Sequence, residues 1–257
     1  MKKILLTITF FSLSFFSYAN DQYDSQLNSL FNQLKSTGSS IAAKEIETKI
    51  WKMWTTHPSE ESLTNLLAKG SYYMSQNQLT SAHNVFSKAI ELDPKWAEAW
   101  NKRATVLYLM GNYELSQNDI DEVLKLEKRH FGALSGQGMV QTALKNYQKA
   151  IDSYVEAHKV YPAMKTPLIM IEKLQVLIQQ ESIRHIMNQL LFFCIILTAF
   201  DLFLIVYALT IPLYPQKWRD KVNKKYQNET ATGITIIFVT LATCFSWIIY
   251  FYFKIFI

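Results

Sequence analysis

The sequence predicts an all-α fold: a solenoid of three helix-turn-helix repeats with flanking capping helices, followed by a C-terminal two-helix transmembrane hairpin. Three observations lead to this prediction. The segments 63–96, 97–130 and 131–164 align with one another without a gap, at a period of 34 residues. The chain has 257 residues and is 49% hydrophobic, which is enough for a core. Two apolar runs near its end, 190–211 and 233–253, are each long enough to cross a bilayer as a helix.

The repeat is defined by the kind of side chain at matching positions. Small residues at the eighth and twentieth positions let two antiparallel helices approach closely, and large residues at the fourth and twenty-fourth fill the space beside them. In that order, the residues are Gly70, Ala104 and Gly138; Ala82, Ser116 and Ala150; Leu66, Trp100 and Leu134; and Phe86, Ile120 and Tyr154. Each helix pair has an apolar face that it cannot bury alone, so neighbouring pairs stack. This pattern and period are typical of the tetratricopeptide repeat (TPR).

Two segments, "AWNKRATVLYLMGNY" and "DIDEVLKLEKRHFGALSG", also make the chain similar to a group of small exported bacterial TPR proteins. The similarity runs from about Leu27 to Gln180 and includes the upstream segment "EIETKIWKMW". It implies the solenoid fold and export from the cytoplasm, and it implies no activity. The two apolar runs near the end of the chain lie outside it.

Helices are expected on both sides of the repeats. Two apolar stripes at helical spacing precede them, and we interpret residues 20–62 as an amphipathic helical pair that caps the open end of the solenoid. The stripes consist of Leu27, Leu30, Phe31 and Leu34, and of Ile46, Ile50, Met53 and Trp54. Residues 165–189 are predicted to form a capping and linker helix that can continue into the first apolar run. The sequence leaves open whether this helix is continuous, and the polar residues 179–182 are the expected place for any break.

The ends of the chain predict a topology. Residues 1–19 combine two lysines, a short apolar stretch and small final residues, which is typical of a cleaved signal peptide. The loop 212–232, between membrane helices 190–211 and 233–253, contains five Lys or Arg against two acidic residues, which predicts that it is cytoplasmic. The repeats are therefore expected on the periplasmic, extracytoplasmic side of the inner membrane, in a multi-pass protein.

Charge and motifs argue against several functional classes. Residues 20–189 contain 18 Lys plus Arg and 18 Asp plus Glu, and this neutral surface lacks the positive charge of a nucleic-acid binder. Cys194 and Cys244 both fall in the predicted membrane helices, so they form no disulfide framework for the exported part. Nucleophile-elbow, phosphate-loop and zinc motifs are missing, and the five histidines are scattered. We therefore predict no catalytic residue, no metal ligand and no cofactor, and an enzyme is the least favoured class.

A structural ion pair is expected inside the second repeat. Arg103 occupies the seventh position, on the face turned toward the second helix, and Asp119 occupies the twenty-third position opposite it. A carboxylate here would satisfy a partly buried guanidinium.

A concave groove is the candidate partner-binding surface. It is formed by fixed positions of each first helix, and its mixture of apolar and hydroxyl side chains with one cation fits a protein or peptide ligand. The alternative is a solvated face with binding elsewhere. The predicted groove residues are Leu67, Ser71, Met74, Glu98, Asn101, Lys102, Thr105, Tyr108, Ser135, Met139 and Thr142.

Two further features have alternative interpretations. Gly132, Gly136 and Gly138 thin the first helix of the third repeat, either for close helix packing or to make room for a ligand. Asp201 lies midway through the first predicted membrane helix, where a charge is costly. It either fastens the hairpin, at the level of Thr240, Thr243 and Cys244, or docks another membrane subunit.

Together these features predict a membrane-anchored scaffold that binds a protein or peptide partner through its groove, as an adaptor in envelope or membrane-complex assembly. The alternative is an integral accessory subunit of a larger membrane complex, assembled through the transmembrane hairpin.

Overall fold

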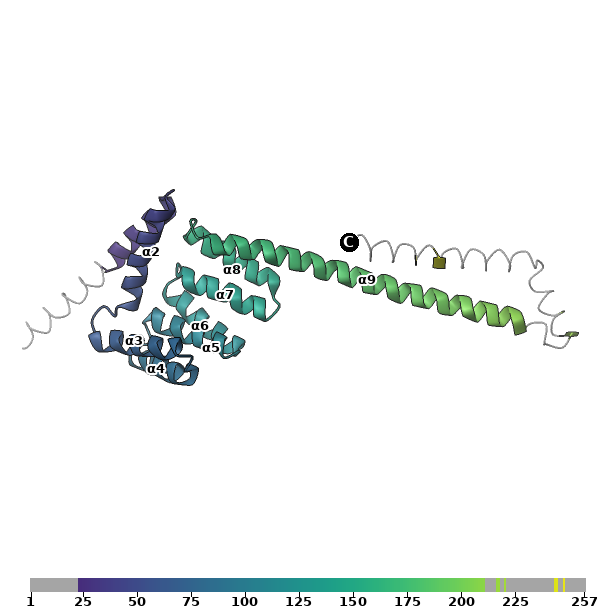
Figure 1. Ribbon diagram of the computed structural model, residues 1–257, viewed down its shortest axis with the longest axis horizontal. Helices are drawn as coiled ribbons and strands as arrows, with labels where there is room; N and C mark the ends of the chain where they lie inside the picture. Colours follow the sequence, from purple (N-terminus) through teal and green to yellow (C-terminus); the bar gives the residue numbers. More distant parts are fainter. Residues whose placement is uncertain (1–22, 211–215, 218–219, 221–242, 245–246, 248–257) are drawn as a thin grey trace, which may run out of the picture. The chain divides into compact units, whose positions relative to one another are not determined.

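The repeats form a stack of antiparallel helix pairs (Figure 1). The computed structural model describes residues 23–210, 216–217, 220, 243–244 and 247, and all secondary structure in this part of the chain is helical. The stacked helices are α3 (Glu61–Ser75), α4 (Leu79–Leu92), α5 (Ala97–Leu109), α6 (Tyr113–Leu126), α7 (Phe131–Ala143) and α8 (Tyr147–Val160). The second and third pairs fall within predicted 34-residue repeats, and the first pair matches its repeat except that α3 begins two residues before it, so the all-α solenoid is confirmed.

Close packing within each pair depends on the small residue at the eighth position. A Cβ added to Gly138 would lie 2.5 Å from Cζ of Tyr154, and one added to Gly70 would overlap the ring of Phe86. Both rings belong to the twenty-fourth position and are almost completely buried. Gly138 therefore serves helix packing, which is one of the two roles expected for the glycines of α7.

The turns between paired helices use the same backbone conformation in all three repeats. Asn77, Gly111 and Lys145 have φ angles of 57°, 78° and 60°, in the left-handed region. Glycine and asparagine adopt this region at little cost, whereas lysine does so against a steric penalty.

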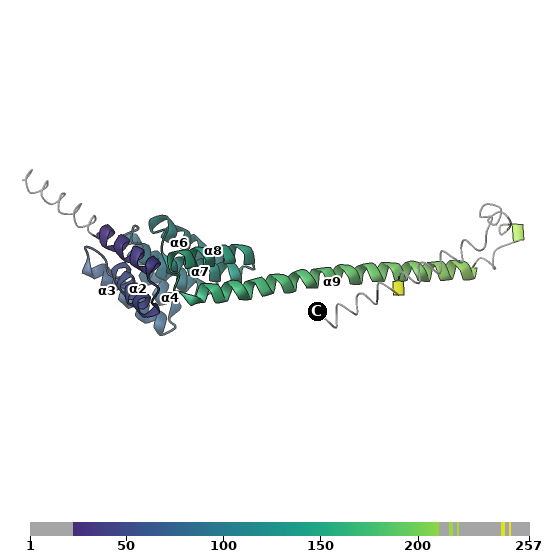
Figure 2. The same ribbon diagram turned by 90° about the horizontal axis from the view of Figure 1, so that it is seen from above.

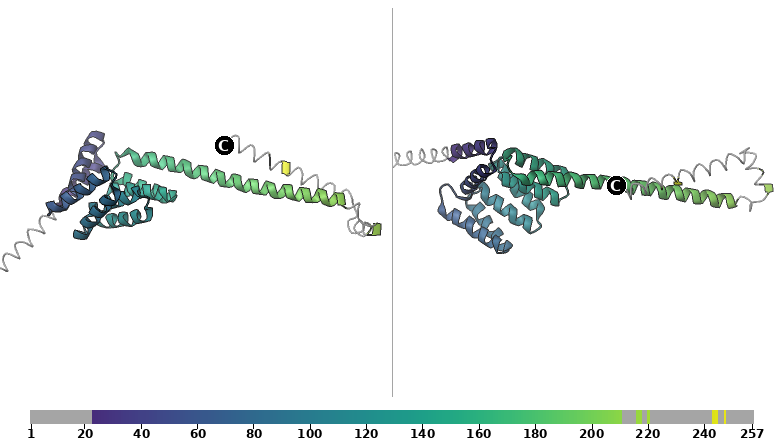
Figure 3. Two further views of the ribbon diagram at one scale, coloured as in Figure 1. Left: turned by 60° about the horizontal axis from the view of Figure 1, so that its bottom comes forward. Right: turned by 45° about the horizontal axis from the view of Figure 1, so that its top comes forward.

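The N-terminal residues form a helical hairpin, made of a helix over residues 23–36 and α2 (Ser40–Thr55), but its position differs from the prediction. Its apolar stripes form one core with Phe131 and Tyr161, at the starts of α7 and of the segment after α8. No residue of α3 or α4 belongs to that core, so the expectation that the pair caps the open end of the first repeat is wrong. Figures 2 and 3 show α2 beside the stack.

The last described helix, α9, runs from Lys165 to Thr210 without a break at residues 179–182. Its first turns continue the solenoid, because Leu174 is buried against Ile151 and Tyr154 of α8. Residues 1–175 and 176–257 are separate compact units. In the described part of the chain one helix, 165–206, is long and apolar enough to cross a membrane, and 6% of its most apolar window is buried. The predicted signal peptide 1–19 and nearly all of the loop 212–232 and second membrane helix 233–253 lie outside the described residues.

Candidate functional site

The predicted groove residues fall into a buried group and an accessible group. Leu67, Glu98 and Asn101 are only 2%, 1% and 8% exposed, so the prediction that these three contact a ligand is wrong. Ser135 is half-buried, and its hydroxyl lies 4.0 Å from the Met164 sulfur. The other seven are half-buried or exposed: Ser71, Met74, Lys102, Thr105, Tyr108, Met139 and Thr142.

The hairpin of residues 23–55, here called the N-terminal cover, buries one end of the groove. The ring of Trp54 stacks on His130 at 3.9 Å between centroids and 9° between planes, and Trp51 meets the Phe131 ring edge-on at 5.3 Å. A Cβ on Gly132 would lie 2.6 Å from Cη2 of Trp51. Gly132 therefore makes room for Trp51 of α2, which is the close helix packing expected as one of the two roles of these glycines.

Under the cover lies a closed polar cluster around Glu98, whose side chain is fully buried. Its carboxylate accepts hydrogen bonds from His130 Nε2 at 3.1 Å and from Asn101 Nδ2 at 2.9 Å, and it pairs with Lys102 Nζ at 3.2 Å. Because His130 Nδ1 accepts the backbone N–H of Ala133, the ring donates to Glu98 as the neutral Nε2–H tautomer.

The balance of forces in this cluster keeps Glu98 ionised. Burial raises the pKa of Glu98, but its contacts with His130, and after them those with Lys102, outweigh burial and hold the pKa below its ordinary value of 4.5. Lys102 Nζ also lies 5.8 Å from the ring centre of Trp51. The single cation among the predicted groove residues is thus already paired within the chain.

Polar contacts at its edges fix the cover. Trp96 Nε1 donates to the carbonyl of Trp54 at 2.9 Å, and the Tyr161 hydroxyl donates to Glu47 at 3.2 Å. Sequence reasoning assigned Trp54 to the apolar stripe of the predicted cap, but it did not place Trp51, Trp54 or His130 at the predicted groove. The W-x-x-W spacing of "WKMW" places both tryptophans on neighbouring parts of one helix face, which was the available signal.

The part of the groove that stays open consists of six residues toward the C-terminal ends of three first helices. We call it the distal groove: Ser71, Met74, Thr105, Tyr108, Met139 and Thr142. None of these six side chains is charged. The three aliphatic hydroxyls, of Ser71, Thr105 and Thr142, donate to carbonyls one turn earlier in their own helices, at 2.9, 2.9 and 2.7 Å. The fourth hydroxyl is the phenol of Tyr108. The distal groove therefore presents mainly methyl, thioether and aromatic groups.

The predicted ion pair between Arg103 and Asp119 is present. Arg103 Nε and Nη2 donate to the two carboxylate oxygens at 2.7 and 2.8 Å, and Nη1 donates to Ser87 at 3.1 Å. Its guanidinium also lies 4.9 Å from the ring centre of Trp100. The paired side chains are 20% and 6% exposed, so this is a bidentate pair inside the second repeat. The hydrogen bond to Ser87 of α4 joins it to the first repeat.

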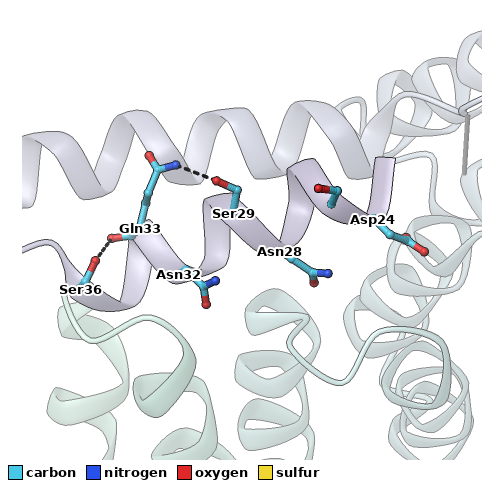
Figure 4. Close-up of a pocket in the computed structure, with 7 residues that line it drawn as sticks. Asp24, Asn28, Ser29, Asn32, Gln33 and Ser36 are labelled. Carbon is cyan, nitrogen blue, oxygen red and sulfur yellow. Dashed lines mark hydrogen bonds between the residues drawn. The ribbon is translucent and has the colours of Figure 1, made fainter. Parts of the chain in front are cut away.

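The outer face of the helix over residues 23–36 carries a row of amides and hydroxyls along an open depression (Figure 4). Gln33 donates to Ser29 at 3.2 Å, so part of the row is paired within the helix. All the residues that line it belong to one helix, and the described residues contain no cluster of metal-ligating side chains.

In the second unit, the Thr243 hydroxyl donates to Oδ2 of Asp201 at 2.5 Å. Thr243 is one of the residues expected at this level, whereas Thr240 lies outside the described residues. The other carboxylate oxygen of Asp201 is buried without a hydrogen-bond partner.

These features define a class of protein: an α-solenoid of stacked helix-turn-helix repeats. The comparisons identify the family. A "TPR repeat" profile matches residues 70–111, and a "Tetratricopeptide repeat" profile matches residues 101–162. A TPR repeat-containing protein of Rhizobium etli is 35% identical over 142 residues, covering 55% of this chain and 69% of the relative. The chain belongs to the tetratricopeptide repeat family.

The more distant relatives match smaller shares of this chain. Hsp70-Hsp90 organizing protein 1 of Glycine max is 28% identical over 94 residues, which are 37% of this chain and 16% of that protein. Among solved structures, the Sgt2 TPR domain from Aspergillus fumigatus is 15% identical with a TM-score of 0.46, covering 48% of this chain and 83% of that domain.

Proposed function

We propose that this protein is a membrane-anchored adaptor whose repeats bind a segment of a partner protein through the distal groove. The observation that carries the proposal is the set of accessible, uncharged side chains at matching positions of α3, α5 and α7, among which Met139 is 43% exposed and Thr105 is exposed. Exposed thioether and aromatic groups on a concave face favour adaptable protein contacts. The name of the Glycine max relative, an organizing protein for two chaperones, is consistent with an adaptor.

The proposal includes a location. The repeats lie on the periplasmic side of the inner membrane, as part of an assembly of the envelope. Support comes from the signal-like residues 1–19, from the apolar helix 165–206, and from the basic residues between the two apolar runs. Protease added to spheroplasts should then digest the repeats while the membrane is intact. Digestion only after lysis would contradict this location.

The experiment compares two substitutions in the full chain. Met139→Glu places a charge in the distal groove, and Leu126→Glu places one on α6 at almost equal exposure, 43% against 42%. Partners that copurify with the wild type from its own membranes should be lost with Met139→Glu and kept with Leu126→Glu. Equal retention by both variants would contradict binding in the groove.

An integral accessory subunit is the second candidate, favoured by one observation. The Oδ1 atom of Asp201 is buried and unpartnered in an apolar helix, where an unsatisfied oxygen is costly. A hydrogen-bond donor from another membrane protein would satisfy it. Loss of partners with Asp201→Leu, but not with Met139→Glu, would favour this candidate.

A further inference from the structure

We infer that the distal groove takes an uncharged, apolar segment of the partner and rejects segments with acidic side chains or a terminal carboxylate. This inference rests on the proposed function, since it presumes that the groove binds a partner, and it adds the chemical class of the ligand. Three independent features of the structure support it.

The first feature is the state of Lys102, which from sequence is the natural receptor for an anion. Its ammonium group lies 3.2 Å from the carboxylate of Glu98, and its side chain is 23% exposed. An incoming carboxylate would have to compete with Glu98, which is fully buried and has no route to solvent. Because the charges of Lys102 and Glu98 compensate each other, the pair attracts a second anion only weakly.

The second feature is the cover above Lys102. The ring of Trp51 lies 5.8 Å from its ammonium group and is held by edge contacts to Trp54 at 5.2 Å and to Phe131 at 5.3 Å. Gly132 provides the space that seats this ring. The ring therefore covers part of the space in which a ligand could meet the cation.

The third feature is the hydrogen bonding of the distal groove itself. The hydroxyls of Ser71, Thr105 and Thr142 already donate to backbone carbonyls of their own helices. An acidic ligand would gain no donor from these three groups, which leaves the Tyr108 hydroxyl as the remaining side-chain donor of the distal groove. One phenol replaces only part of the hydration of a carboxylate, and desolvating a poorly paired carboxylate is strongly unfavourable. An aliphatic or aromatic ligand gains contacts with Met74, Tyr108 and Met139, and its apolar groups give up no hydrogen bonds to water.

The test uses the full chain, purified in detergent micelles, and a displayed library of random 12-residue peptides with free C-termini. Recovered peptides should be rich in Leu, Ile, Met and aromatic residues and poor in Asp and Glu. Their affinity should fall at least about tenfold with Met139→Glu and less than about twofold with Leu126→Glu. Salt screens interactions between charges, so the affinity of an uncharged peptide should change less than about twofold between low and high salt.

The other outcomes separate the inference from the proposed function. Acidic peptides that lose binding with both Met139→Glu and Lys102→Ala would overturn the inference and leave a partner-binding groove in place. Peptides whose affinity is unchanged by Met139→Glu bind elsewhere on the protein, and they would overturn both the inference and the proposed function. Recovery of no peptide above the level of empty micelles would also count against both.

Discussion

The contact between Gly132 and Trp51 gives a sharp test of the N-terminal cover. In Gly132→Ala, the new methyl group would lie 2.6 Å from Cη2 and 3.1 Å from Cζ2 of Trp51, whereas ordinary contacts begin at 3.4 Å. The ring cannot move freely, because Trp54, His130 and Phe131 surround it. Overpacking of this kind costs about 1–3 kcal/mol.

The helix propensity of alanine opposes this cost only in part. Replacing glycine by alanine in a helix interior stabilises by about 0.8–1.0 kcal/mol, and Gly132 lies in the first turn of α7, where the gain is smaller. Gly132→Ala should therefore destabilise the fold by about 1–2 kcal/mol. The matched control is Gly136→Ala in the same helix, where the nearest atom to a new Cβ is 3.7 Å away. This variant should stabilise by about 0.5–1 kcal/mol.

The measurement is urea denaturation of the full chain in detergent micelles, followed by helical circular dichroism. Opposite shifts of the two midpoints are expected. Combining Gly132→Ala with Trp51→Ala should remove the cost of the added methyl, because the double-mutant cycle isolates the contact between the two side chains. Equal stabilisation by both glycine variants would show that Trp51 does not lie over Gly132.

Three further predictions use the same denaturation assay. The pKa of Glu98 lies below its ordinary 4.5 in the fold, so its contribution to stability is present above pH 4.5 and is lost as the pH falls through the folded-state pKa. Glu98→Gln should therefore be less stable than wild type at pH 7, and the gap should narrow in acid; a constant gap would contradict the cluster. Asp119→Ala leaves Arg103 without its carboxylate partner and should lower the free energy of unfolding by about 3 kcal/mol, the low end for a buried pair. Lys125→Ala, on the exposed surface, is the control and should leave the free energy of unfolding unchanged. Lys145→Gly relieves a left-handed lysine, at φ 60°, and should stabilise by about 1 kcal/mol; a loss of stability would refute the strain.

The repeats and their internal contacts were predictable because they depend on spacing along the chain. The eighth and twenty-fourth positions recur every 34 residues, so a small residue facing a ring can be recognised from one copy to the next. The same register placed Arg103 opposite Asp119, sixteen residues away, and the structure shows that pair at 2.7 Å.

The position of the N-terminal cover could not be predicted in this way. The stripe that ends at Trp54 shows that one helix face is apolar, but it does not show which surface that face meets. The surface is formed by Phe131 and Tyr161, far along the chain, and it has no repeat register with α2. Glu98 was misplaced for the same reason. Its repeat position points into the groove, and the cover buries that part of the groove.

The cover is a permanent part of the fold, since a ligand could not displace it and still bind well. Lifting it would expose the aromatic rings that meet across it, Phe31, Trp54, Phe131 and Tyr161, each now 6% exposed or less. At about 1.5–3 kcal/mol for each buried side chain, the loss is about 6–12 kcal/mol. A complex of micromolar to nanomolar affinity has only about 8–12 kcal/mol of binding free energy in total. We therefore expect the proposed ligand to bind beside the cover, on the distal groove, where the six side chains are uncharged.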